Sequence, residues 1–133
     1  GDAGAGQTVK ILNNMILCQT VVALGEALAV ARAHGVDGKV LYETLTKGSA
    51  DSFALRNHGM KAMLAGLFPE RAFSTEYALK DLGYAIEMAG EKGVPALGAD
   101  VARELMERAV ELGHGKEYWP VLLRAIEDAT GNG

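Results

Sequence analysis

This chain of 133 residues contains little cysteine and proline and has no surplus of positive charge. A single cysteine, Cys18, excludes an internal disulfide, so nothing in the sequence requires an oxidising compartment and we expect a cytoplasmic protein. Thirteen Lys and Arg against 17 Asp and Glu leave a formal net charge of -4, without the basic surplus that nucleic-acid backbones attract. We therefore expect no nucleic-acid partner.

Residues that favour strands are also few. The sequence holds 21 Ala and 16 Leu against 20 Val, Ile and Thr combined, and no stretch alternates apolar and polar residues over the length of a strand. With 49% hydrophobic and 23% charged residues, the chain has the composition of a globular protein, and its length suits one domain. The sequence predicts a single all-α domain over residues 1–133.

The first predicted helix is unusually long. It runs from about Gln7 to His34 without proline, and Gly35 is placed to end it in the left-handed conformation. About 28 residues reach roughly 42 Å, whereas a compact domain of this size has a diameter of roughly 36 Å. We expect a helical bundle of about six or seven helices built around this one.

The middle of this long segment, residues 15–31, is apolar on nearly every side. Such a helix is either central to the fold or covered by a second chain. A membrane span is the competing interpretation, but Gln19, Thr20 and Glu26 interrupt a run already shorter than the ~20 residues a span needs. We expect no membrane partner.

Capping residues, glycines and prolines predict the remaining helices. Asp37 suits the cap of a helix to about Thr46, and Ser74 or Thr75 suits the cap of one to about Lys92, closed by Gly93. Four further helices are expected from about Ser52, over Met60–Leu67, from Ala96 to Leu112, and from Trp119-Pro120 to about Ala129.

Two polar residues on the first helix are candidates for chemistry. Lys10 and Asn14 are four residues apart and so share one face near the expected N-terminal end. A cation is disfavoured at the positive end of a helix, so we expect the pKa of Lys10 to fall, and a neutral lysine is a usable general base. The alternative for Lys10 is an ordinary solvated lysine on the surface. The alternative for the glycines that precede it is a flexible leader.

Other charged and aromatic residues are less specific. Lys80 and Asp81 lie in the middle of a predicted helix, where an ordinary charged pair is the alternative to a site. The three histidines have no metal-ligand spacing to one another or to Cys18, so we expect no metal and no catalytic histidine. Trp119 is assigned to packing or an interface.

Taken together, these segments resemble the 3-hydroxyisobutyrate dehydrogenase (β-hydroxyacid dehydrogenase) family, which is related to 6-phosphogluconate dehydrogenase. The first motif is Gly1-x-x-Gly4-x-Gly6-x-x-x-Lys10-x-x-Asn13-Asn14. Later landmarks in the same order are Glu26-Ala27-Leu28, Gly48-Ser49-Ala50-x-Ser52-Phe53, Phe73, Lys80-Asp81-Leu82 and Gly93-Val94-Pro95. One departure is Tyr118, which stands where the family often has Asp in a Gly-x-Gly-x-x-Asp pattern.

The resemblance implies a role for each matching residue. Lys10 would be the acid/base for hydride transfer between a small 3-hydroxy acid and NAD or NADP. Asn14 would orient the substrate, Phe73 and Asp81 would border its pocket, and Lys80 would approach the cofactor.

The resemblance covers the helical C-terminal domain of that family, which serves catalysis and dimerisation. The family's N-terminal Rossmann domain, with its Gly-x-Gly-x-x-Gly turn after a strand, is absent from this sequence. We therefore expect that the chain works with that domain in a longer homo-oligomeric enzyme, and that it is inactive alone. The alternative is a non-catalytic helical dimerisation or interaction module.

Overall fold

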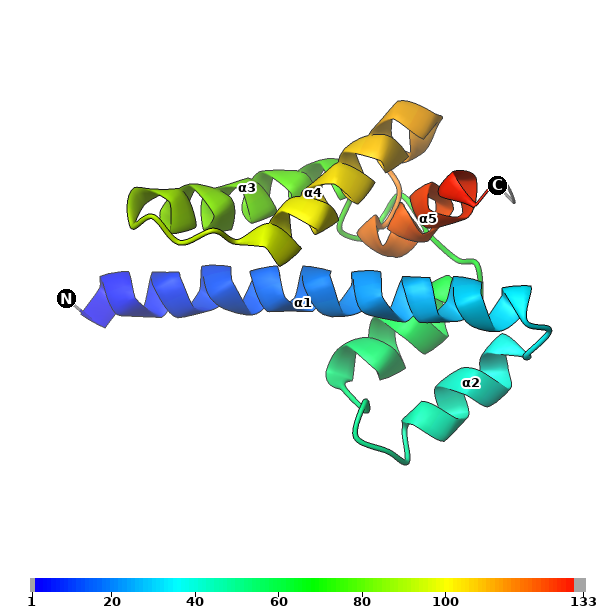
Figure 1. The fold of residues 1–133 in the computed structure, drawn as a ribbon. Coiled ribbons are helices and arrows are strands. Elements are labelled where there is room, and N and C mark those ends of the chain that lie inside the picture. The colour runs from blue at the N-terminus through cyan, green and yellow to red at the C-terminus, as the bar shows by residue number, and fades with distance from the viewer. Residues whose placement is uncertain (1, 131–133) are drawn as a thin grey trace.

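The computed structural model describes residues 2–130, which form six continuous helical segments and no strand. Helix α1, Asp2–Ala33, crosses the whole molecule. Figure 1 shows α3, α4 and α5 on one side of α1 and α2 on the other. The prediction of an all-α bundle around one long N-terminal helix is confirmed.

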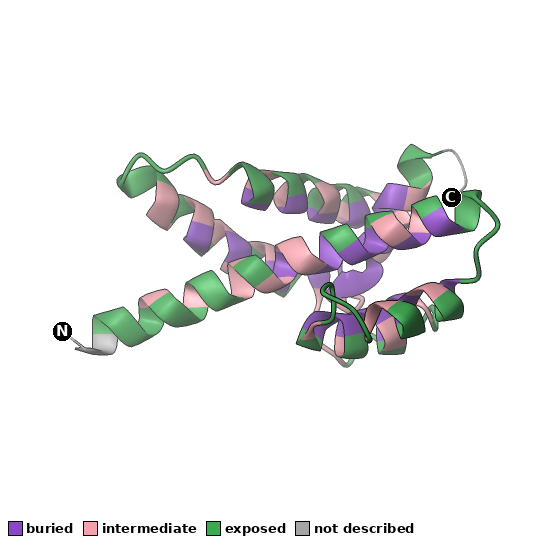
Figure 2. Cartoon of the chain, turned by 60° about the horizontal axis from the view of Figure 1, so that its bottom comes forward, coloured by how far each residue is buried: buried purple, intermediate pink, exposed green. Residues whose placement is uncertain are grey.

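Helix α1 is both the core of the bundle and an extension beyond it. Its second half contributes Val21, Leu24 and Leu28 to the contiguous apolar core, whereas its first half is mainly exposed or half-buried, as Figure 2 shows. Of the two alternatives for the apolar stretch, burial in the core holds for Val21, Leu24 and Leu28, whereas Ile16 and Val30 stay exposed. By length and composition, residues 4–33 would also pass as a membrane span, a test that a core helix passes as well.

The predicted start of this helix is wrong. It was placed at about Gln7, but the backbone is already helical at Asp2, so Gly4 and Gly6 lie inside the helix and do not form a leader before it. Gly1 of the glycine motif lies outside the described residues. The sequence misled because glycine lowers helix propensity by only about 1 kcal/mol, which the rest of a 32-residue helix outweighs.

On one side of α1 lie α2, Gly38–Leu45, and the π-helix η1, Leu55–Met63. Asp37 caps α2 as predicted, because its carboxylate accepts a hydrogen bond from the backbone N–H of Lys39 at 2.7 Å. The buried hydroxyl of Tyr42 donates to the carbonyl of Leu24 at 2.8 Å and ties α2 to α1.

The two short helices expected from Ser52 and over Met60–Leu67 are wrong as separate elements. One continuous segment replaces them, and it ends near Leu64 because the backbone turns at Gly66, where φ is +69°. The wide turns of η1 bring Gly59 against the ring of Tyr42, where an added Cβ would lie 3.3 Å from Cε2. No local sequence pattern predicts the contact between Gly59 and Tyr42.

The other side of α1 holds the remaining elements. These are α3, Thr75–Glu91; α4, Leu97–Ala109; the π-helix η2, Val110–His114; the 3-10 helix η3, Trp119–Leu122; and α5, Leu123–Ala129. Ser74 caps α3 as predicted by accepting from the backbone N–H of Tyr77 at 3.2 Å. The glycines expected to end two of these helices, Gly93 and Gly113, both have positive φ.

A short backbone crossing joins the start of α3 to the start of η3. Ser74 and Tyr118 form an isolated antiparallel bridge. The backbone N–H of Thr75 donates to the carbonyl of Glu117 at 2.9 Å, and that of Trp119 donates to the carbonyl of Phe73 at 3.0 Å. Two aromatic residues 46 positions apart, Phe73 and Trp119, are thereby held side by side.

Glycines in helices provide a test of the packing around α1. A Cβ at Gly38 would lie 2.7 Å from Cδ1 of Leu28 and 2.9 Å from Cδ1 of Leu64, so Gly38→Ala should lower the free energy of unfolding by about 1–3 kcal/mol. Gly83, inside α3, has nothing within 4 Å, and Gly83→Ala should raise it by about 0.5–1 kcal/mol. Urea denaturation of the two variants measures both, and equal effects would contradict this packing.

Candidate functional site

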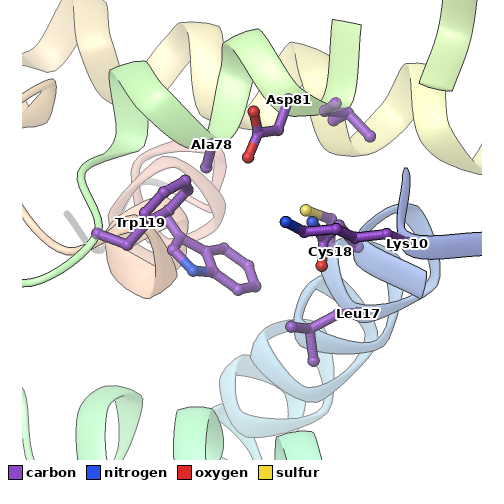
Figure 3. Close-up of a pocket in the computed structure, with 9 residues that line it drawn as sticks. Lys10, Leu17, Cys18, Ala78, Asp81 and Trp119 are labelled. Carbon is purple, nitrogen blue, oxygen red and sulfur yellow. The ribbon is translucent and has the colours of Figure 1, made fainter. Parts of the chain in front are cut away.

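A pocket of about 330 Å³ lies where the first half of α1 passes the N-terminal part of α3 (Figure 3). Helix α1 supplies one wall, α3 the opposite wall, and the segments joined by the Ser74–Tyr118 crossing close it. The lining residues are Lys10, Asn14, Leu17, Cys18, Phe73, Ala78, Asp81, Leu82 and Trp119.

Four of the five residues predicted for the site come together here. Lys10 and Asn14 from α1 face Asp81 from α3, and Phe73 lies beside them. Lys80 does not line this pocket. It is exposed, since neighbouring residues of a helix point about 100° apart and its neighbour Asp81 is the one turned toward the pocket.

The polar groups of the pocket are uncommitted. Among the side chains described, those of residues 4–130, no hydrogen bond or ion pair engages the Lys10 ammonium, the Asn14 amide or the Asp81 carboxylate. In Figure 3 the Lys10 side chain extends across the pocket toward Trp119, and the Asp81 carboxylate points in from α3. A ligand that enters therefore meets a proton donor or acceptor, an amide and a carboxylate that no protein group already occupies.

The sequence-based argument from the helix terminus does not apply to Lys10. Because α1 is already helical at Asp2, Lys10 lies about two turns inside the helix. The field of the helix dipole falls off within the first turn. The surroundings of Lys10 are therefore the residues that line the pocket, not the end of the helix.

Cys18 forms part of the pocket floor. Its side chain is 6% exposed, and burial, together with the negative charge of Asp81, raises the pKa of the thiol to about 12. At neutral pH the group is a protonated, apolar wall and not a nucleophile. The influence of Asp81 on this thiol also reflects how closely α1 and α3 approach at the site.

Behind the pocket, His58 packs against Trp119 with ring centroids 5.1 Å apart. His58 is 7% exposed and its Nδ1 has no partner among the described residues. Burial lowers the pKa of this histidine, so the ring is neutral at pH 7 and supports the aromatic wall without adding charge. In the part of the chain described, no cluster of His, Cys, Asp or Glu could hold a metal ion.

Several lining residues were missed from the sequence. Leu17 and Cys18 follow Lys10 at i+7 and i+8, so the spacing that paired Lys10 with Asn14 could have extended the same face to both. Trp119 was assigned to packing or an interface, and no local signal places it in the pocket. Its position depends on the crossing at Ser74 and Tyr118.

A protein-family model matches most of the chain. Residues 4–125 match the family model described as "NAD-binding of NADP-dependent 3-hydroxyisobutyrate dehydrogenase". The chain belongs to this family. The match extends from the glycine-containing start of α1 into α5, and so includes every residue of the pocket.

Individual relatives agree. The chain is 32% identical over 131 residues to 2-(hydroxymethyl)glutarate dehydrogenase of Eubacterium barkeri, covering 98% of this chain and 43% of that protein. It is 26% identical to NAD-dependent L-serine dehydrogenase of Pseudomonas aeruginosa, covering 98% of this chain and 46% of the relative.

A solved structure matches the fold as well. Crystalline 3-hydroxyisobutyrate dehydrogenase from Salmonella typhimurium superposes with a TM-score of 0.84 at 28% identity, covering 91% of this chain and 42% of that one. The chain therefore spans less than half the length of the dehydrogenases that it matches.

The thiol of Cys18 reports on the pocket. With a pKa of about 12, it should react with iodoacetamide at pH 8 roughly 10³-fold more slowly than an ordinary thiol, and at the ordinary rate once urea unfolds the chain. Asp81→Asn removes the charge that helps to raise this pKa and should accelerate labelling. Asp100→Asn, a matched change at an ion pair with Arg103 outside the pocket, should not. Labelling of the folded protein at the ordinary rate would contradict the burial of Cys18.

Proposed function

We propose that this chain is the helical C-terminal domain of an NAD(P)-dependent dehydrogenase of small 3-hydroxy acids, and that Lys10 is its acid/base. The observation that carries the proposal is the pocket between α1 and α3, where Lys10, Asn14 and Asp81 meet without protein partners. Membership of a dehydrogenase family supports it independently.

In the proposed reaction the neutral amine of Lys10 accepts the proton of the substrate hydroxyl and becomes an ammonium ion. A bound nicotinamide cofactor would supply the hydride acceptor for the carbinol carbon, so that the alcohol, having given its proton to Lys10, would become a carbonyl. In the reverse direction the Lys10 ammonium returns the proton to the oxygen. Proton transfer by a positioned side chain contributes typically about 10²–10⁴-fold to a rate.

The other pocket residues hold the substrate for this step. Asn14 lies one helical turn after Lys10, where its amide can donate to the substrate oxygen while Lys10 approaches the hydroxyl. Phe73 and Asp81 border the substrate on the opposite side. Because these groups sit on two packed helices and a tied segment, they are oriented before the substrate arrives.

The described residues of this chain could contact the cofactor, NAD or NADP, but could not hold all of it. The described residues contain no parallel sheet with a glycine-rich turn, which is the structure that holds a dinucleotide. Exposed Lys80, next to Asp81, is the residue we expect to approach the cofactor from the rim of the pocket. The missing sheet supports an N-terminal Rossmann domain in the full-length protein. The lengths of the relatives support it too, since they are more than twice as long as this chain.

We also propose that the enzyme is a homo-oligomer of the cytoplasm, related in its helical domain to 6-phosphogluconate dehydrogenase. Apolar side chains along α1 remain exposed in the single chain, with Val9 at 67%, Ile16 at 60% and Val30 at 59%, and packing of another domain or subunit would cover them. The alternative, a non-catalytic dimerisation module, also uses this surface, but it assigns no role to the pocket.

A first prediction concerns the chain alone. Because it lacks a dinucleotide-binding sheet in its described part, it should transfer no hydride with any 3-hydroxy acid and either cofactor. Absorbance at 340 nm measures the reduced nicotinamide. Appreciable turnover would contradict the proposed division of labour between two domains.

A second prediction concerns Lys10 in the full-length protein. Lys10→Ala should lower kcat for oxidation by about 10²–10⁴-fold, and Lys10→Arg should not restore it, because a guanidinium does not give up its proton. Lys47→Ala, an exposed lysine in the turn after α2, is the matched control and should leave kcat unchanged. Lys80→Ala should raise the KM for the cofactor more than it lowers kcat. A loss of less than a few-fold on Lys10→Ala would favour the non-catalytic module.

A further inference from the structure

The pocket continues into a second recess that shares its polar residues. This smaller cavity, of about 190 Å³, is lined by Gln7, Lys10, Ile11, Asn14, Asp81 and Tyr84. Lys10, Asn14 and Asp81 therefore form a common wall between two compartments. The smaller recess adds Gln7, Ile11 and Tyr84 to these three residues, whereas the remaining lining of the larger pocket is apolar.

The apolar compartment has a fixed end wall, the indole of Trp119. This side chain is 5% exposed, its backbone N–H is held by the carbonyl of Phe73 at 3.0 Å, and the His58 ring packs behind it. Pro120 follows at the start of η3 and restricts the backbone further. An indole supported in this way cannot withdraw to make room for a larger ligand.

The compartment also disfavours charge. Apart from Lys10, Asn14 and Asp81, its lining comprises Leu17, Cys18, Phe73, Ala78, Leu82 and Trp119, and the thiol is protonated at neutral pH. Lys10 is the one cation in the lining, and the proposed reaction engages it with the substrate hydroxyl. An additional carboxylate placed here would lose its hydration, find no free cation and face Asp81.

We propose that this compartment receives the non-reacting substituent on C2 of the 3-hydroxy acid and that Trp119 is the residue that limits its size. The inference rests on the proposed function and narrows its substrate class: the substituent is compact and uncharged, such as hydrogen or methyl. Trp119 then determines specificity, whereas Lys10 performs the proton transfer.

The test uses the full-length protein and a series of 3-hydroxypropanoates that carry hydrogen, methyl, isobutyl or carboxyethyl at C2. The last of these acids is 2-(hydroxymethyl)glutarate. Values of kcat/KM should be at least about tenfold higher for methyl than for isobutyl or carboxyethyl. Trp119→Leu should raise the isobutyl-to-methyl ratio at least about tenfold by opening the end wall, and should raise the carboxyethyl-to-methyl ratio less, because Asp81 and the apolar lining remain.

Two further variants separate size selection from general damage to the core. Trp119→Phe keeps an aromatic ring and should shift the isobutyl-to-methyl ratio in the same direction by a smaller factor. Phe68→Leu is the matched aromatic-to-leucine control, since Phe68 packs under Arg124 outside the pocket, and it should leave the ratio unchanged. Because a ratio is measured within one preparation, a partly unfolded variant does not distort it.

The outcomes distinguish this inference from the proposed function. The proposed role of Trp119 is wrong if kcat/KM for the isobutyl or carboxyethyl acid equals that for the methyl acid. It is also wrong if Trp119→Leu changes both ratios by less than about threefold from those of the unmodified enzyme. Neither result affects the proposed role of Lys10. If the acids are oxidised but Lys10→Ala lowers kcat by less than a few-fold, the acid/base role of Lys10 is wrong. If no acid of the series is oxidised, the proposed function and this inference are both wrong.

Discussion

The packing of α1 across α3 is the constraint on which the rest of this structure depends. The second half of α1 is anchored in the core through Val21, Leu24 and Leu28, and the first half projects from that anchor as a rigid rod. Since a continuous helix has little freedom to bend, burial of the second half sets the direction in which Lys10 and Asn14 point. Lys10 and Asn14 are therefore positioned by apolar contacts more than a turn away along the helix.

The backbone crossing between Ser74 and Tyr118 has the complementary role on the opposite wall. It fixes the start of α3, and with it the rotation that turns Asp81 toward α1 and Lys80 away. The same crossing delivers Trp119 beside Phe73. A few hydrogen bonds between segments distant in sequence thus determine which charged residue faces the pocket and how deep the pocket is.

The chemistry of the pocket follows from how unevenly its polar groups are distributed. Three uncommitted polar side chains line both cavities, and apolar side chains make up the rest of the larger cavity. In such surroundings the proposed general base, Lys10, would act on a hydroxyl without competition from internal ion pairs. Burial keeps Cys18 protonated and His58 neutral, so neither adds a charge that would disturb this arrangement.

Much of the fold and part of the site could be predicted from the sequence because their signals are local. Helical composition, the caps at Asp37 and Ser74 and the stops at Gly93 and Gly113 each depend on neighbouring residues, as does the shared face of Lys10 and Asn14. The start of α1 and the continuity of η1 were missed, since in both places the favourable energy of a longer helix or of packing outweighs a weak local preference.

The sequence by itself determined that this protein is helical, that one long apolar helix organises it, and which face of that helix carries the lysine and the asparagine. Only the tertiary structure decided that Phe73, Asp81 and Trp119 close around that face, that Lys80 stays outside, and that Lys10 lies well inside its helix. The physical reason is distance along the chain: periodicity and capping act over a few residues, whereas the pocket is made by contacts between segments many tens of residues apart.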